Sequence, residues 1–102
     1  MTTNQIEVEA LARDFHDATL LRIEFEWERG VAIITTLDSD GQKRLIIDGV
    51  VHLECARSFP WGRSVSINRV EVTAGPADTL LISIEMQSGD MLALRGSSIR
   101  LA

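Results

Sequence analysis

Apolar and charged residues alternate without a break between positions 21 and 28 of this 102-residue chain. The apolar residues are Leu21, Ile23, Phe25 and Trp27, and the charged residues are Arg22, Glu24, Glu26 and Glu28. Because successive side chains of a β-strand point to opposite faces, this period predicts a strand with one buried and one solvated face. We therefore expect Trp27 to lie in the core with the other three apolar side chains.

Turn signals divide the chain after this strand into further strand-like runs. The signals are Arg29-Gly30, Ser39-Asp40-Gly41, the residues from Ala74 to Asp78, and Ser88-Gly89-Asp90. The runs between them are 31–37, 44–56, 64–73, 80–86 and 91–95, and 99–101 is a last short strand or a tail that pairs at an edge. Short connections imply antiparallel neighbours, so we predict a meander of six or seven strands.

The third run, 44–56, has no polar face over Leu45-Ile46-Ile47 and Val50-Val51. A strand of this kind is expected at the centre of a sheet, covered on both sides. Gly49 inside the run predicts a bulge or a bend.

One short helix is expected before the strands. Asn4 can cap it, and Glu7 three positions later resembles a capping box. Val8, Leu11, Ala12 and Phe15 then fall on one helical face. A single helix cannot cover so many strands, so the sheet must close as a sandwich or an open barrel. The predicted fold is mainly β within the α+β class.

Length and charge restrict the classes of function. Residues 1–102 fit a single β-rich domain. The net charge is −5, with ten basic residues spread among fifteen acidic ones, which argues against nucleic acid as a partner. No apolar run reaches the roughly 20 residues of a membrane span, and the N-terminus does not resemble a signal peptide. The single Cys55 is expected to be buried, and its lack of a partner favours the cytoplasm.

An aromatic connection runs from Ser58 to Ser64 and contains Phe59 and Trp61. Such aromatics either close the end of a core or face a partner. Trp61 is the stronger candidate for facing a partner, and closure of the core end is the equal alternative for it. Arg63 follows in the same stretch. Ser64, Ser66 and Asn68 share one strand face, where they could hold a ligand or a peptide, or satisfy backbone groups at a corner.

Two pairs of ionisable residues are candidates for chemistry. His16 and Asp17 are adjacent after Phe15, where they could form local hydrogen bonds or part of a binding surface. His52 and Glu54 share a face of the third strand. If the pairs met in space, the four side chains could bind a metal or a small ligand. The chain contains no nucleotide-binding, paired-cysteine or nucleophile motif, so we expect no cofactor, no resident metal and no catalytic residues.

The segment Phe15-His16-Asp17-Ala18, followed by a strand that ends in Glu26-Trp27-Glu28, resembles the start of small bacterial domains related to immunity protein 50. The element from Pro60 to Ser64 is similar to one that recurs in small uncharacterised bacterial β-rich proteins. The resemblance implies a small cytoplasmic binding protein that neutralises a toxin partner. It also implies one shared structural or binding element, which comprises Phe15, His16, Asp17, Trp61 and Ser64.

The sequence thus predicts a non-catalytic protein that binds a protein partner. That partner includes a second copy of the chain, because apolar strands end at edges that invite pairing into a dimer. The binding residues expected are Phe15, His16, Asp17, Trp61, Arg63, Ser64 and Asn68. The alternative is a small-ligand or metal-binding domain, enzymatic or not, that uses His16, Asp17, His52 and Glu54.

Overall fold

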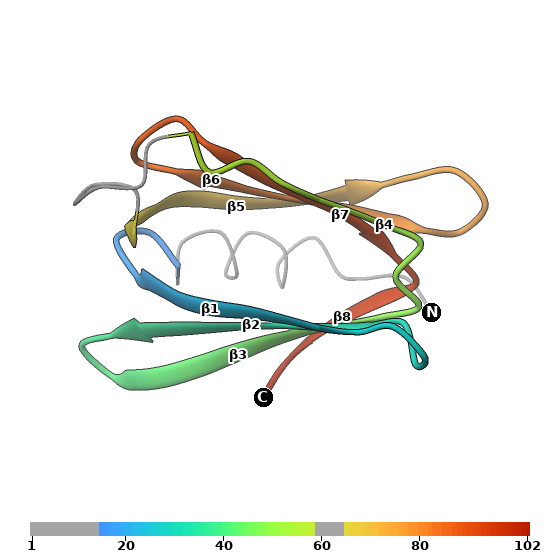
Figure 1. The fold of residues 1–102 in the computed structure, drawn as a ribbon, viewed down its shortest axis with the longest axis horizontal. Coiled ribbons are helices and arrows are strands. Elements are labelled where there is room, and N and C mark those ends of the chain that lie inside the picture. The colour runs from blue at the N-terminus through green and yellow to red at the C-terminus, as the bar shows by residue number, and fades with distance from the viewer. Residues whose placement is uncertain (1–14, 59–64) are drawn as a thin grey trace.

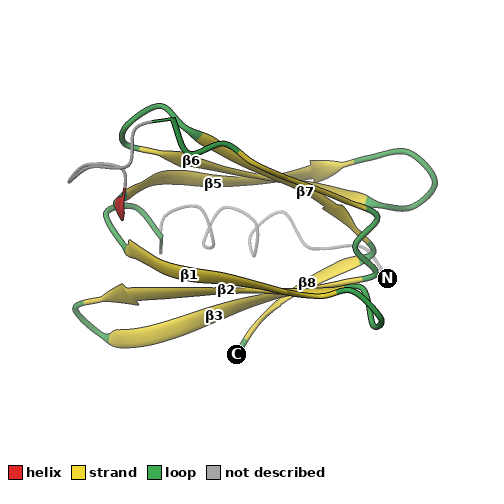
Figure 2. Ribbon diagram, viewed as in Figure 1, coloured by secondary structure: helices red, strands yellow, loops and turns green. Residues whose placement is uncertain are grey.

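Two four-stranded antiparallel sheets face each other in the computed structural model, which describes residues 15–58 and 65–102 (Figures 1 and 2). The first sheet has the order β1 (Thr19–Glu26), β2 (Val31–Asp38), β3 (Gly41–Asp48) and β8 (Ser98–Leu101). The second has the order β4 (His52–Cys55), β7 (Met91–Gly96), β6 (Leu80–Met86) and β5 (Ile67–Ala74). The prediction of a mainly β fold is confirmed, and of the two expected forms, a sandwich or an open barrel, the structure has two facing antiparallel sheets. The strands do not follow one another as a simple meander, because β8 pairs with β3 and β4 pairs with β7. The expected helix and residues 59–64 of the aromatic connection lie outside the described residues.

The described residues form eight strands instead of the six or seven expected, because the third predicted strand divides at Gly49. This glycine has a left-handed φ of 62°, and a Cβ added to it would lie 2.9 Å from the Cβ of Ser97. The chain bends here from β3 in one sheet to β4 in the other, and at Ser97 it passes from β7 back to β8. The bend expected at Gly49 is therefore a corner that joins the two sheets.

The core lies between the inner faces of the two sheets. Its buried members on the first sheet are Ala32, Ile34, Leu45 and Ile47, and those on the second are Ile67, Val70, Val72, Ile82, Ile84, Met86, Leu92 and Leu94. Within each strand these residues recur at every second position, because alternate side chains point inward. The exception is Ile67 and Val70, which are three apart because a register shift between Ile67 and Arg69 interrupts the alternation in β5. Phe15 and Ala18 complete the core from the turn before β1.

The centre of the first sheet explains why β3 has no polar face. β3 pairs with β2 on one side and with β8 on the other, which confirms the predicted central position for this part of the run 44–56. For the rest of the run the prediction is wrong, since β4 is an edge strand and Val51 before it is exposed. Ile46 lies on the outer face and is nevertheless buried. The register places it between Ile33 and Arg100, and Glu24 stands beyond Ile33. Long charged side chains can cover such an apolar strip with their aliphatic stems.

The prediction that Trp27 lies in the core is wrong, since its side chain is 87% exposed. β1 ends at Glu26, where the Gly30 amide donates to the Glu26 carbonyl at 2.9 Å and closes a turn. Trp27 thus stands in the turn after the strand, where the pleat no longer directs it inward. Leu21 is also exposed, because a register shift between Leu20 and Arg22 interrupts the alternation.

Cys55 is exposed as well, contrary to the prediction of a buried thiol. It is the last residue of the four-residue edge strand β4, so only one neighbouring strand can cover it. Within the part of the chain that the structure describes, no helix is long and apolar enough to cross a membrane.

Candidate functional site

The turn from Phe15 to Ala18 joins the two sheets at the end opposite the Gly49 corner. Asp17 has a left-handed φ of 66°, and its amide donates to the Ile67 carbonyl at 2.8 Å. The Ile67 amide in turn donates to the Ala18 carbonyl at 2.8 Å. The turn buries Phe15 completely and leaves His16 exposed. Phe15 is therefore a core anchor in this structure and offers no surface to a partner.

His16, Asp17 and Asn68 come together at this junction. The Nδ1 atom of His16 lies 2.6 Å from the Asn68 carbonyl oxygen, which can only accept, so Nδ1 carries the proton. The Asn68 amide donates to the Glu85 carboxylate at 2.6 Å, and the Gln87 amide donates to the Asp17 carboxylate. Three of the predicted binding residues thus form one cluster with two residues of β6 and its turn, which the sequence did not indicate. Its hydrogen bonds form two adjacent sets: one joins His16, Asn68 and Glu85, and the other joins Asp17 and Gln87.

The chemistry of this cluster is structural. His16 Nε2 lies 3.6 Å from the Asp17 carboxylate, which is too long for a hydrogen bond, and this ion pair forms only when the imidazole is protonated. The cluster fastens the start of β1 to β5 and β6.

His52 and Glu54 lie far from this cluster in the second sheet. Their side chains face out from β4, with His52 Nε2 at 3.4 Å from Glu54 Oε2. β7 and β6 lie between β4, which carries His52, and β5. His16 contacts β5 at Asn68, near the start of that strand. The structure therefore does not bring the two pairs into one site. Across 15–58 and 65–102, no group of three or more His, Cys, Asp or Glu side chains could hold a metal ion.

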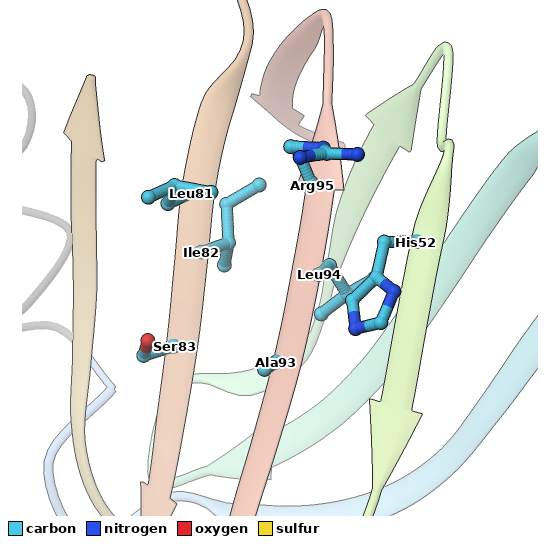
Figure 3. A pocket seen from close by; sticks show the side chains of 7 residues that line it. All are labelled: His52, Leu81, Ile82, Ser83, Ala93, Leu94 and Arg95. Carbon is cyan, nitrogen blue, oxygen red and sulfur yellow. The ribbon is translucent and has the colours of Figure 1, made fainter. Parts of the chain in front are cut away.

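A shallow hollow lies on the outer face of the second sheet beside His52, with a volume of about 320 Å³ (Figure 3). Its lining residues are His52, Leu81, Ile82, Ser83, Ala93, Leu94 and Arg95. Ser83 and Ala93 are directly opposite each other on β6 and β7, so their small side chains leave the floor low. His52 and Arg95 are likewise cross-strand partners on β4 and β7. The sequence alone does not indicate this hollow, because the hollow depends on the strand order.

A second groove of about 300 Å³ separates the start of β1 from the segment after β4. Its lining residues are Leu20, Leu21, Arg22, Ile23, Cys55, Ala56, Arg57, Val65, Met86 and Asp90. Asp90 is buried and accepts hydrogen bonds from the Ser58 amide and the Ser88 hydroxyl. The Asp90 carboxylate therefore holds the chain in place at the groove through these hydrogen bonds.

The Trp27 turn is the third surface feature. The Trp27 and Phe25 rings pack edge to face at a centroid distance of 6.0 Å, and Trp27 is otherwise open to solvent. The Val50 amide donates to the Gly30 carbonyl at 2.8 Å, which ties the turn to the sheet corner. Val51, in the next position, is 64% exposed. An exposed indole and an exposed valine thus lie at the same end of the sandwich.

The remaining predicted binding residues, Trp61, Arg63 and Ser64, lie outside the described residues. No family model matches the chain, and no curated protein matches it. Among solved structures, the fold is similar to that of an uncharacterized protein from Neisseria gonorrhoeae, with a TM-score of 0.64 and 15% sequence identity. The alignment covers 85% of this chain and 91% of that chain. This likeness shows the fold alone.

Proposed function

We propose that this protein is a non-catalytic domain that binds a protein partner through the Trp27 turn. The observation that carries the proposal is the 87% exposure of the Trp27 side chain on an ordered turn. Tryptophan is enriched among the residues that dominate binding energy in protein interfaces. Burial of a large aromatic side chain in an interface removes an unfavourable apolar surface from water.

Charge favours a basic partner. The chain carries a net charge of −5, and Glu28 stands beside Trp27 in the turn. Arg29 is already paired with Glu26 at 3.0 Å, and Glu28 has no ion pair among the described residues. The turn therefore offers a partner a carboxylate next to an indole. Complementary charge accelerates association, whereas two copies of an acidic chain repel each other. These terms favour a different, basic protein over a second copy.

Two further features support a toxin as the partner and the cytoplasm as the compartment. The resemblance of residues 15–18 and 26–28 to domains related to immunity protein 50 supports a toxin as the partner that this protein neutralises. The thiol of Cys55 is exposed and has no second cysteine in the chain, which supports residence in a reducing cytoplasm.

The experiment compares three tagged proteins as bait in an extract of the source organism: wild type, Trp27→Ala and Leu37→Ala. Leu37 is 41% exposed at the opposite end of the first sheet, so it controls for the loss of an exposed apolar side chain. We expect a protein that wild type and Leu37→Ala retain and that Trp27→Ala loses. Titration with the purified partner should then show a loss of affinity of at least about thirtyfold, or 2 kcal/mol.

An identical set of captured proteins with all three baits would contradict the proposal. If the only Trp27-dependent complex is between copies of this chain, the result supports the Trp27 turn as a binding surface. The same result contradicts the assignment of a different protein as the partner.

A further inference from the structure

Arg95 differs from the other cations that the structure describes. Most of them form ion pairs with carboxylates: Arg22, Arg29, Lys43, Arg69 and Arg100. Three described arginines form no such pair: Arg44, Arg57 and Arg95. Arg44 and Arg57 are exposed, so water solvates their guanidinium groups, whereas Arg95 is half-buried. Among the described residues, Arg95 is therefore the cation that has lost part of its hydration without gaining a carboxylate.

Arg95 lies where its charge can contact a ligand. It borders the hollow on the outer face of the second sheet, with His52 opposite on β4 and Leu81 opposite on β6. Figure 3 shows the three side chains on three neighbouring strands, with Ser83 and Ala93 one step further along the sheet. Arg95 thus forms a cationic side of the hollow, Leu81 forms an apolar side, and the small side chains of Ser83 and Ala93 form a low floor.

His52 adds a second donor. Its Nε2 atom faces Glu54 at 3.4 Å, and no contact to its Nδ1 atom is found in the described chain. As an imidazolium, His52 can donate from Nε2 to Glu54 and from Nδ1 to a bound anion.

We propose that this hollow binds a small organic carboxylate. The guanidinium of Arg95 matches a carboxylate with two parallel hydrogen bonds, and His52 supplies a further one. The apolar body of the ligand lies over Ala93 and against Leu81, which is 38% exposed. The hollow of about 320 Å³ is at the lower end of the range for small-molecule sites, which limits the ligand to roughly the size of one ring.

The test is an NMR titration of the full-length ¹⁵N-labelled protein with three probes. Sodium benzoate carries both the carboxylate and an apolar ring, benzamide keeps the ring without the charge, and inorganic phosphate keeps an anion without the ring. We expect saturable shifts of the amides of Ser83, Ala93 and Arg95 with benzoate, at a dissociation constant on the order of 1 mM. Benzamide and phosphate should each bind at least about tenfold more weakly.

Variants separate this site from general attraction of anions. Arg95→Gln should weaken benzoate binding by about tenfold or more, because it removes a charge-assisted bidentate contact. Arg44→Gln is the matched control, since Arg44 is an unpaired arginine on the outer face of the other sheet, and it should leave the affinity unchanged. Circular dichroism of each variant checks that the fold persists.

Three results would overturn the proposal: no saturable shift with benzoate, equal binding of benzoate by Arg95→Gln and wild type, or phosphate binding as tight as benzoate binding. The Trp27 turn takes no part in this experiment. The outcome of the benzoate titration is therefore independent of the proposed protein-binding function.

Discussion

Three consecutive residues have three different roles. Phe15 packs in the core, His16 hydrogen-bonds to the backbone of β5, and Asp17 forms the turn. The left-handed φ of Asp17 reverses the chain so that Phe15 is buried while His16 reaches the Asn68 carbonyl. Asp and Asn tolerate this backbone region better than most residues. A residue with that tolerance is therefore what allows a fully buried ring and an exposed imidazole to be neighbours.

Asp38 is the residue whose ionisation couples most clearly to its contacts. A hydrogen bond from the Lys43 side chain at 3.1 Å is the main cause that lowers the pKa of this carboxyl below 3.8, and the Asp40 amide at 2.8 Å assists. A lowered pKa means that the unfolded chain takes up protons first as the pH falls. The contribution of Asp38 to stability is therefore present above pH 3.8 and is lost as the pH falls through the lowered pKa.

We expect Asp38→Asn to be less stable than wild type at pH 7 and to approach wild-type stability in strong acid. Urea unfolding monitored by circular dichroism at several pH values measures this difference. Lys43→Gln should reduce the same pH dependence, because it removes the main cause of the shift. A stability difference between wild type and Asp38→Asn that is constant from pH 7 to pH 2 would be inconsistent with this assignment.

At the level of elements, the β3–β4 and β7–β8 corner determines how the sheets are joined. Gly49 and Gly96 lie where the two bent segments approach each other most closely. A Cβ on Gly96 would come within 2.6 Å of the Ile47 side chain, and a Cβ on Gly49 would meet Ser97. Only glycine permits this approach, and Gly49 needs the left-handed backbone as well.

Gly49→Ala should destabilise the protein by about 2–4 kcal/mol, since it adds backbone strain to a steric clash. Gly89→Ala is the control, because Gly89 also has a positive φ, of 97°, but nothing lies within 4 Å of an added Cβ. Urea denaturation should show the larger loss for Gly49→Ala.

The double variant Gly49→Ala with Ser97→Gly should recover part of the loss, since it removes the clashing side chain. Equal destabilisation by Gly49→Ala and Gly89→Ala would mean that the close approach at the corner contributes nothing.

For the whole molecule, the free edges of the two sheets determine whether copies associate. β4 and β8 are edge strands of four residues each, and the edge strand β1 presents Arg22, Glu24 and Glu26 on its outer face. Short and charged edges oppose strand pairing between molecules. The net charge of −5 adds repulsion between copies.

We therefore expect the purified protein to sediment as a monomer at concentrations of about 100 µM in low salt. Adding salt screens the repulsion and tests whether charge alone prevents association. A stable dimer at low salt would contradict this expectation and support the self-association that the apolar strands of the sequence suggest.

Local features of the sequence predicted most of the strands. The alternation in β6 and the Asp-Gly turn between β2 and β3 depend only on neighbouring residues, and the structure has them where the pattern indicates. Gly49 predicted a bend for the same local reason. The environment of Trp27 was predicted wrongly, because β1 ends at Glu26 and the pleat of the strand no longer directs the next side chain inward.

The surface features could not be predicted in the same way. His16 meets Asn68 across 52 positions in sequence, and Ser83 faces Ala93 only because β6 and β7 pair in that register. The low floor between His52, Arg95 and Leu81 exists only once β4, β7 and β6 are neighbours. No short-range period contains that information.

The sequence alone determined that this chain forms antiparallel strands with a common core, because periodicity, turns and burial act between near neighbours. Only the tertiary structure decided that the strands divide four and four at the Gly49 corner. It also decided that Trp27 faces solvent and that Arg95 borders a hollow. Each of these outcomes depends on which strands pair, and strand pairing is set by the balance of packing over the whole molecule.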